Sequence, residues 1–380
     1  MKKTHKIFST ALLFLMTACI ALTGCERRTE AWKPGRPLAR ELLKIGVIHI
    51  SNVEGASSGY AYAHDMGVRE LQGRLGLKDE QIIRKFNVSD TDPVATEHSI
   101  RECIAQGANV IIATSWNHRD VCEKLAGQFP GVVFANATGD KRNESNLTYG
   151  FGRIYQPRYL SGIVAGLRTR TNKIGYVAAM GKDNSEVTGG LNAFALGVES
   201  VNPAARVHVR VTHRWFDPAG EALAARRLME DGCDVIAQHS NTPGPQIEAQ
   251  KAGKWGIGYN SDMRGEAPKA VMTSVVWNWG VYYTRLTQNA LDGTFTTQPY
   301  LGDLKDGMVG ITPFNEELVP TGAAEAVDAA RKRMESGEFD GVEGALETNT
   351  GRGVGAAGAR LASEEIASGM NWYSRSVSEP

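Results

Sequence analysis

The sequence predicts an α/β protein with two doubly wound lobes joined by a hinge. From Leu43 onward, short β-branched runs alternate with segments of helical periodicity, the pattern of a parallel sheet covered by helices. The pattern begins again at Lys173, so the chain carries two such units. With 380 residues, 42% of them hydrophobic, the chain is long enough to bury both cores.

The first unit contains four predicted strands, at 44–50, 82–88, 109–114 and 132–135. Helices separate them. The first places Val68, Leu71 and Leu75 on one face, the second opens at Asp92-Pro93 as N-cap and first residue, and the third carries Val121 and Leu125. These short connections favour parallel strands with helical crossovers.

The second unit repeats this order. Predicted strands at 173–178, 206–212 and 234–238 alternate with two helices. The first helix has Val187, Leu191, Phe194 and Val198 at helical spacing, and the second runs from Asp217-Pro218 through Leu228. One more helix is predicted at 320–337, and a Gly- and Ala-rich stretch at 341–362 is expected to wrap the surface.

The N-terminus has the pattern of an export signal. Lys2, Lys3 and Lys6 form a basic region, an uncharged stretch covers 7–24, and Leu22-Thr23-Gly24-Cys25 resembles the bacterial lipobox. We expect removal of residues 1–24, lipidation of Cys25, and a tether over 25–42. The alternative is an uncleaved anchor helix with a chance cysteine.

Charge and cysteine content narrow the class of protein. Forty-two Lys and Arg balance 42 Asp and Glu, which argues against nucleic acid as a partner. Apart from Cys19 in the signal and Cys25, the chain has Cys103, Cys122 and Cys233. An odd number excludes a complete disulfide framework, so we expect buried free thiols; a Cys103–Cys122 pair is the alternative.

Motifs for catalysis and cofactors are weak. Gly353, Gly355 and Gly358 form a Gly-x-Gly-x-x-Gly match, but no predicted strand precedes it. The sequence has no P-loop, no nucleophile elbow and no metal-ligand spacing. We therefore expect no catalytic residue, no cofactor and no metal. Of the histidines, His64 and His239 are the better ligand candidates because they lie near predicted strand ends.

The predicted ligand site lies beyond the carboxyl ends of the strands, where open α/β sheets bind ligands. This places it at 49–60, 114–120, 180–192, 238–242 and 259–262. Five aromatic residues fall in or beside predicted connections between strands and helices: Tyr60, Trp116, Trp215, Trp277 and Trp279. Such rings suit a flat ligand, although core packing is the alternative. The helical spacing of Phe194 argues for the core.

Several strings resemble a known family. Arg153-Ile-Tyr-Gln-Pro-Arg-Tyr-Leu160 with Gly162 and Gly166 is similar to the lobe-crossing helix of the basic membrane proteins. Further similarity covers 191–197, 215–218, 234–239, 258–262, 273–279 and 370–373. These relatives are lipoprotein solute-binding components of ABC importers, many for purine nucleosides or bases. The resemblance spans 43–375 and implies a periplasmic binding protein fold of type I.

This fold implies a division of the chain into lobes. The N-terminal lobe is expected to comprise 43–154 and 277–305, and the C-terminal lobe 155–276 and 306–320. The remaining residues, 321–380, are expected to form a C-terminal helix and a tail that packs as part of the domain.

The resemblance also assigns binding residues. Tyr60 falls on the Phe that stacks the base in nucleoside-binding members, with Ser57 and Ala61 in place of the motif's Asp and Asn. Phe194 falls on a second stacking Phe. The ribose-holding Asp and Lys fall on Asn260 and Trp277. Since these replacements remove charged partners for ribose hydroxyls, a free purine base is favoured over a nucleoside.

Polar groups must then read the edge of the base, by donor and acceptor pattern. The candidates are Ser115, Asn117, Asp120, His239 and Asp262. Together with the aromatic residues and Asn260, the expected ligand-binding set is Tyr60, Ser115, Trp116, Asn117, Asp120, Phe194, Trp215, His239, Asn260, Asp262 and Trp277.

The resulting hypothesis is a lipid-anchored, monomeric protein of the cell envelope, facing the periplasm or the exterior. It would bind its solute between two closing lobes and deliver it to an ABC permease and ATPase. A sensor that presents the same solute to a signalling partner is one alternative, and a nucleoside-hydrolysing enzyme is another. A LacI-type DNA regulator is excluded because it would need a helix-turn-helix where the lipobox stands.

Overall fold

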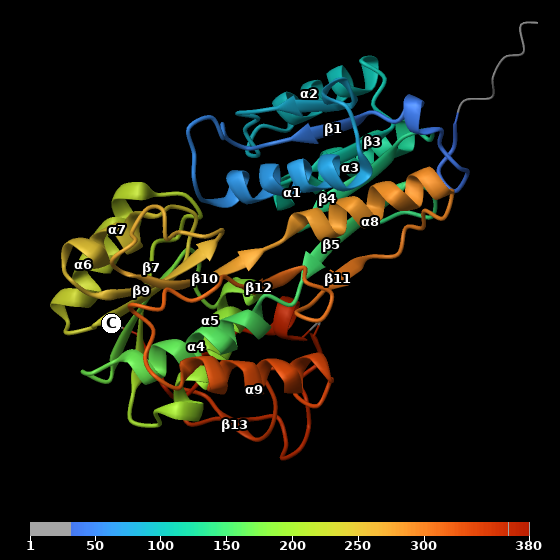
Figure 1. Ribbon diagram of the computed structural model, residues 1–380. Helices are drawn as coiled ribbons and strands as arrows, with labels where there is room; N and C mark the ends of the chain where they lie inside the picture. Colours follow the sequence, from blue (N-terminus) through green and yellow to red (C-terminus); the bar gives the residue numbers. More distant parts are fainter. Residues whose placement is uncertain (1–31, 364, 380) are drawn as a thin grey trace, which may run out of the picture. The chain divides into compact units, whose positions relative to one another are not determined.

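The computed structural model describes residues 32–363 and 365–379. Two sheets with helices on both sides dominate it (Figure 1). Both sheets belong to one contact unit, Lys33–Pro380, and each forms the centre of a lobe. The predicted signal peptide and residues 25–31 of the predicted tether, Cys25 among them, lie outside the described residues.

The sheet of the N-terminal lobe has six strands in the order β11-β5-β4-β3-β1-β2, all parallel. The strands are β1 (Ile45–Ile48), β2 (Ile82–Lys85), β3 (Val110–Ala113), β4 (Val133–Ala137), β5 (Leu147–Gly152) and β11 (Tyr300–Gly302). The helices are α1 (Tyr60–Leu75), α2 (Pro93–Ala105), α3 (Arg119–Gln128) and α8 (Trp279–Asp292). Helix α8 packs beside α1 although it comes much later in the chain (Figure 1).

The sheet of the C-terminal lobe has seven strands in the order β12-β10-β9-β8-β6-β7-β15. These are β6 (Lys173–Ala178), β7 (Arg206–Val211), β8 (Val235–His239), β9 (Trp255–Asn260), β10 (Val271–Trp277), β12 (Val309–Ile311) and β15 (Val377–Ser378). The helices are α4 (Tyr155–Arg168), α5 (Ser185–Val201), α6 (Pro218–Glu230), α7 (Gly244–Lys251) and α9 (Ala323–Glu335).

The two sheets share one topology. The order β2-β1-β3-β4-β5 in the first is repeated as β7-β6-β8-β9-β10 in the second. Each repeat is a doubly wound sheet, which confirms the fold class predicted from the two alternating patterns. The chain passes between the sheets three times: from β5 through α4 to β6, from β10 through α8 to β11, and from β11 to β12.

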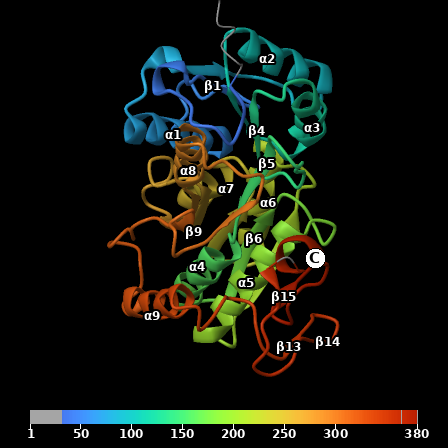
Figure 2. The ribbon, with the colours of Figure 1, turned by 90° about the vertical axis from the view of Figure 1, so that its right-hand side faces the viewer.

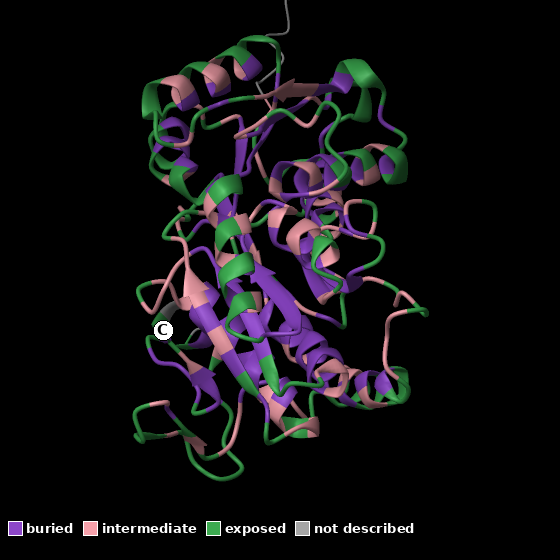
Figure 3. Cartoon of the chain, turned by 90° about the vertical axis from the view of Figure 1, so that its left-hand side faces the viewer, coloured by how far each residue is buried: buried purple, intermediate pink, exposed green. Residues whose placement is uncertain are grey.

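Separate cores fill the two lobes. Cys103 and Cys122 lie in the core of the N-terminal lobe and Cys233 in that of the C-terminal lobe. All three are buried free thiols, as favoured from the odd count, and Cys103 and Cys122 are not paired. Figure 3 shows that the strands are largely buried, whereas the outward helix faces are exposed.

Local signals explain where several helices begin. The Asp92 carboxylate accepts hydrogen bonds from the amides of Val94 and Ala95, and the Asp217 carboxylate accepts one from Gly220. Each aspartate precedes a proline at the first helical position, so both predicted N-caps are confirmed.

Helices α4 and α5 approach each other closely because glycines line their contact. A Cβ on Gly162 would lie 2.1 Å from the carbonyl oxygen of Phe194, and one on Gly197 would lie 2.1 Å from that of Tyr159. Any side chain at these two positions would push the helices apart.

The C-terminal tail returns to the second sheet. Strand β15 pairs with β7 at the sheet edge, and Figure 2 shows the tail beside α5. The Asn192 side chain donates to the carbonyl of Trp372 at 2.7 Å and accepts from the amide of Ser374 at 2.8 Å. The tail therefore forms part of the domain and is not a loose extension.

Candidate functional site

The loops after the carboxyl ends of the two sheets meet across the lobes. Ser57 and Ser58, in the loop between β1 and α1, both donate to the carboxylate of Glu266, Ser58 at 3.0 Å. The amide of Gly59 donates to the hydroxyl of Ser261 at 3.0 Å. The first loop of the N-terminal lobe is thus hydrogen-bonded to the loop after β9, and the two predicted loop regions lie together.

A row of aromatic rings runs from α1 to the end of β10. Tyr60 packs edge-on against His64, with ring centroids 4.5 Å apart. His64 stacks on Trp279 at 4.3 Å, and Trp279 stacks on Trp277 at 5.1 Å with only 9° between the ring planes. The row therefore connects the start of α1 with the strand that leads out of the C-terminal lobe.

A polar chain continues from this row. The indole nitrogen of Trp277 donates to the hydroxyl of Tyr259 at 3.1 Å, and that hydroxyl donates to Glu186 Oε1 at 3.4 Å. His239 Nε2 lies 3.5 Å from the same oxygen. We call Tyr60, Glu186, His239, Tyr259 and Trp277 the inter-lobe cluster, because the N-terminal lobe supplies the first and the C-terminal lobe supplies the rest.

Burial controls the charges in this cluster. It raises the pKa of Glu186 to about 7, against the opposing effects of the Arg158 charge and the hydrogen bond from Tyr259. Burial lowers the pKa of His239 well below its ordinary value, with a smaller contribution from Arg158, so the imidazole is neutral. Arg158 itself is fully buried, and its guanidinium carbon lies 4.2 Å from the centroid of the Tyr259 ring.

Several buried polar atoms near the cluster have no hydrogen-bond partner among the described residues. They are His239 Nε2, Asn260 Oδ1 and, on Arg158, Nε and Nη2. The remaining guanidinium nitrogen, Nη1, donates to the carbonyl of Gln238 at 2.6 Å. Buried polar groups are ordinarily hydrogen-bonded, so these atoms are available to a bound polar molecule.

The predicted residues after β3 have other partners. The Ser115 hydroxyl and the Asn117 amide both donate to the Asp90 carboxylate, at 2.7 and 3.2 Å. Trp116 is 46% exposed and lies beneath the guanidinium of Arg119. Asp120 is on the outer side of α3, where its exposed carboxylate pairs with Lys141 at 2.9 Å.

The predicted residues of the C-terminal lobe divide into two groups. His239 belongs to the inter-lobe cluster, and Trp215 and Asn260 lie near it: Trp215 packs edge-on against His239, and the Asn260 amide donates to Asn241 Oδ1 at 3.0 Å. Phe194 is fully buried against Tyr176, as its helical spacing indicated. Asp262 is partly exposed and forms a two-pronged ion pair with Arg264.

Sequence reasoning did not single out Glu186, Tyr259 or Arg158. The first two lie inside the predicted connections 180–192 and 259–262, so position alone could have marked them. Arg158 is in the first turn of α4, and no local pattern distinguishes it from a surface arginine.

With this geometry in view, similarity to known proteins decides the family. A family profile described as "ABC transporter substrate-binding protein PnrA-like" matches residues 43–336. The chain belongs to this family. The resemblance drawn from the sequence strings is thereby confirmed.

Two relatives are similar to this protein over most of its length. A purine-binding protein of Brucella abortus is 33% identical over 345 residues, covering 91% of this chain and 95% of its own. An ABC transporter glucose-binding protein of Haloferax volcanii is 32% identical over 315 residues, covering 82% of this chain and 77% of its own.

Solved structures show the same fold. A solute-binding protein of an ABC transporter system from Conexibacter woesei has a TM-score of 0.64 at 21% identity, covering 78% of this chain and 97% of that one. A transcriptional activator of the comK gene from Bacillus halodurans has a TM-score of 0.66 at 21% identity, covering 78% and 99%. At this identity, the likeness concerns architecture alone.

Membership of the family decides the class of function. The PnrA-like protein is a substrate-binding protein of an ABC transporter and not an enzyme, so the hydrolase alternative is wrong. It takes a small-molecule ligand, works with permease and ATPase subunits, and acts outside the cytoplasm. In the part of the chain that the structure describes, no helix has the length and apolar character of a membrane span.

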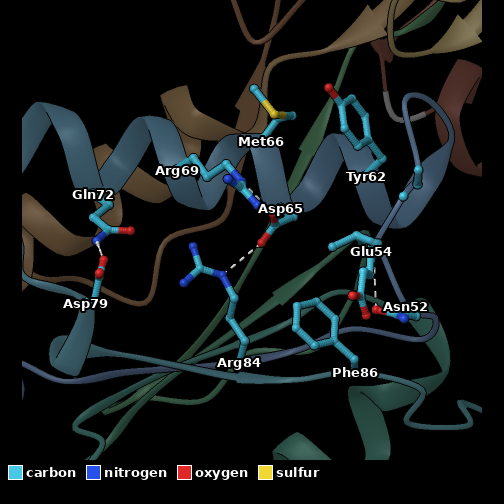
Figure 4. Close-up of a pocket in the computed structure, with 13 residues that line it drawn as sticks. Asn52, Glu54, Tyr62, Asp65, Met66, Arg69, Gln72, Asp79, Arg84 and Phe86 are labelled. Carbon is cyan, nitrogen blue, oxygen red and sulfur yellow. Dashed lines mark hydrogen bonds and ion pairs between the residues drawn. The ribbon is translucent and has the colours of Figure 1, made fainter.

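A hollow of about 680 Å³ lies on the N-terminal lobe alone, between α1, the edge strand β2 and the first loop (Figure 4). Asp65, on α1, points into it and accepts hydrogen bonds from Arg69 and Arg84, each at 2.8 Å. Burial alone would raise the pKa of Asp65, but these two guanidinium groups outweigh it and lower the pKa. The charged groups here largely satisfy one another.

Proposed function

We propose that this protein binds a purine base between its two lobes and delivers it to an ABC permease. A free base is favoured over a nucleoside. The ligand would lie against the inter-lobe cluster, in contact with Tyr60, His239 and Trp277 and with Trp215 and Asn260 nearby. The protein would be held at the membrane by lipid on Cys25.

The observation that carries the proposal is the aromatic row from Tyr60 to Trp277 at the meeting of the lobes. Flat rings at a binding site suit a flat ligand, and one stacking contact with a base contributes about 1–3 kcal/mol. The name of the Brucella abortus relative, a purine-binding protein, supports the same ligand class.

The preference for a free base is supported by two side chains. Asn260 and Trp277 fall where the nucleoside-binding members have an Asp and a Lys for the ribose. Here the Asn260 amide donates to Asn241 and the Trp277 indole donates to Tyr259. Neither residue offers a charged partner to ribose hydroxyls, so a ribose would form few favourable interactions at this site.

Native mass spectrometry of the mature domain as purified tests the proposal. Denaturation should release adenine, hypoxanthine or guanine from those molecules that were purified in the closed, ligand-bound form. A released nucleoside would show that ribose is accommodated despite Asn260 and Trp277. Release of a hexose would place this protein with the Haloferax volcanii relative in ligand class and would overturn the proposal.

The anchor is tested separately. Cells that express the full chain with a labelled fatty acid should incorporate label, and Cys25→Ser should abolish the incorporation and release the protein from membranes. Cys19→Ser is the matched control, because Cys19 lies within the predicted signal. Label retained in the Cys25→Ser variant would contradict lipidation at this residue.

A further inference from the structure

One carboxyl group in the inter-lobe cluster, that of Glu186, is held in position by its helix but does not have a hydrogen bond on both oxygens. Glu186 is in the first turn of α5, and Asn184 caps this helix by accepting a hydrogen bond from the amide of Val187 at 3.0 Å. The side chain is only 20% exposed. The helix dipole favours a carboxylate in the first turn, which opposes part of the effect of burial on this group.

The neighbours of Glu186 engage one of its two oxygens. Tyr259 donates to Oε1, since its own oxygen already accepts the Trp277 N–H. Tyr176 lies 3.3 Å from His239 Nδ1, and donation by this hydroxyl leaves the second imidazole nitrogen to carry a proton toward Oε1 at 3.5 Å. Among the described residues, Oε2 has no hydrogen bond and no ion pair.

The charged and titratable groups around Glu186 come from five elements. They are Tyr60 on α1, Arg158 on α4, Tyr176 on β6, His239 on β8 and Tyr259 on β9. Arg158 is the one cation in this group, and it makes no direct hydrogen bond to Glu186. Burial raises the pKa of Tyr60, and the charge of Glu186 makes a smaller contribution to this shift. The Tyr60 hydroxyl itself donates to the carbonyl of Thr114.

We infer that Glu186 is a specificity-determining residue: its free oxygen, Oε2, accepts a ring N–H from a purine base held between the lobes. This inference rests on the proposed function and adds a residue to it. A free base carries a ring N–H on its imidazole half, where a nucleoside carries ribose. The hydrogen bond from this ring N–H to the Glu186 carboxylate would therefore account for a preference for a free base over a nucleoside.

The inference has a pH signature. Only the ionised carboxylate accepts an N–H at both oxygens, and burial raises the pKa of Glu186 to about 7. The ionised fraction consequently rises about tenfold between pH 6 and pH 8, and the affinity for a base should rise by about the same factor. The bound base in turn stabilises the carboxylate, so binding should release a proton below pH 7.

Calorimetric titration with adenine, which keeps its charge over this range, tests the inference. The wild-type affinity should rise about tenfold from pH 6 to pH 8, with proton release visible as a dependence on buffer ionisation enthalpy. Glu186→Gln should bind adenine roughly tenfold more weakly at pH 8 and with no pH dependence, because its amide accepts only as a neutral group. Asp183→Asn, which removes an exposed carboxylate three residues upstream, is the matched control and should keep the wild-type slope.

The outcomes separate the inference from the function on which it rests. Adenine binding with the same pH slope in Glu186→Gln as in the wild type, or with no slope in either, would overturn the role of Glu186 and leave the proposed function standing. Failure of the wild type to bind any purine base at any of these pH values would overturn both.

Discussion

A buried carboxylate, Asp65, and a partly buried one, Glu186, show the difference between a structural ion pair and a group open to a ligand. Asp65, beside the hollow of the N-terminal lobe, has one guanidinium on each oxygen. Glu186, between the lobes, has a tyrosine hydroxyl on one oxygen and only the more distant charge of Arg158. The pKa of Asp65 is lowered, whereas that of Glu186 is raised to about 7. A carboxylate with a partner on both oxygens stabilises the fold, whereas a carboxylate with an unpaired oxygen is available to a ligand.

The largest expected effect is on stability, at Asp65. Its side chain is 3% exposed, and Asp65→Asn leaves Arg84 without its counter-charge. Removing one partner of a buried ion pair costs about 3–5 kcal/mol, and the partly exposed Arg69 and Arg84 place this variant near the lower value. Urea unfolding should show this loss.

Asp328→Asn is the matched control for that measurement. Asp328 forms an exposed ion pair with Lys332 at 2.7 Å on α9, and its loss should change the unfolding free energy by about 0.5 kcal/mol or less. Equal effects of the two variants would contradict a structural role for Asp65.

The pH dependence of stability should have opposite signs at the two carboxylates. The contribution of Asp65 is present above its ordinary pKa of 3.8 and is lost as pH falls below this value. Glu186 binds its proton more tightly in the folded state, so the wild type should lose stability relative to Glu186→Gln as pH rises from 4.5 to about 7, by up to about 3 kcal/mol. If the unfolding free energies of Asp65→Asn and Glu186→Gln, each relative to the wild type, changed in the same direction with pH, the contrast between the two carboxylates would be refuted.

The next effect concerns affinity at the aromatic row. Trp277→Ala should weaken binding of a purine base by about 1–3 kcal/mol, because the ring provides a stacking face. Trp255→Ala is the matched control: Trp255 begins β9 and contacts the guanidinium groups of Arg168 and Arg170, at the opposite end of the strand from the cluster. Calorimetry should show an unchanged affinity for the control, and an unchanged affinity for Trp277→Ala would place Trp277 outside the binding site.

The smallest effect is expected at the loop contact between the lobes. Ser58→Ala removes one of the hydroxyls that bond to Glu266, and a net hydrogen bond contributes about 0.5–1.5 kcal/mol. Because this contact joins the lobes, the loss should be seen as a faster ligand dissociation rate in stopped-flow measurements. An unchanged dissociation rate in the double variant Ser57→Ala/Ser58→Ala would show that these bonds do not hold the closed form.

The fold could be predicted well because its signals are local. Alternating patterns identified the repeated doubly wound unit, and Asp92 and Asp217 marked two helix starts that the structure confirms. Strand β5, with the glycine-containing sequence Leu147–Gly152, and the three-residue strand β11 gave no such signal. Their membership of the sheet depends on pairing with distant residues, which no short window contains.

The candidate site could be predicted only in part, for the same reason. His239 and Trp277 end strands β8 and β10, and Tyr60 lies at the end of the loop after β1, so their positions at or beyond strand ends located them. Glu186 matters through contacts with Tyr259 and His239, on two other strands, and through the burial that their packing produces. Such contacts are set by tertiary structure. Asp120, whose residue type suggested base recognition, instead pairs with Lys141 on the surface.

Whether the lobes bind a purine base and exclude the ribose can be measured by calorimetric titration of the mature domain at pH 8 with adenine, adenosine and glucose. Adenine should bind at least tenfold more tightly than adenosine, and glucose should produce no binding heat. Tighter binding of adenosine, or binding of glucose without adenine, would contradict this preference for a free base.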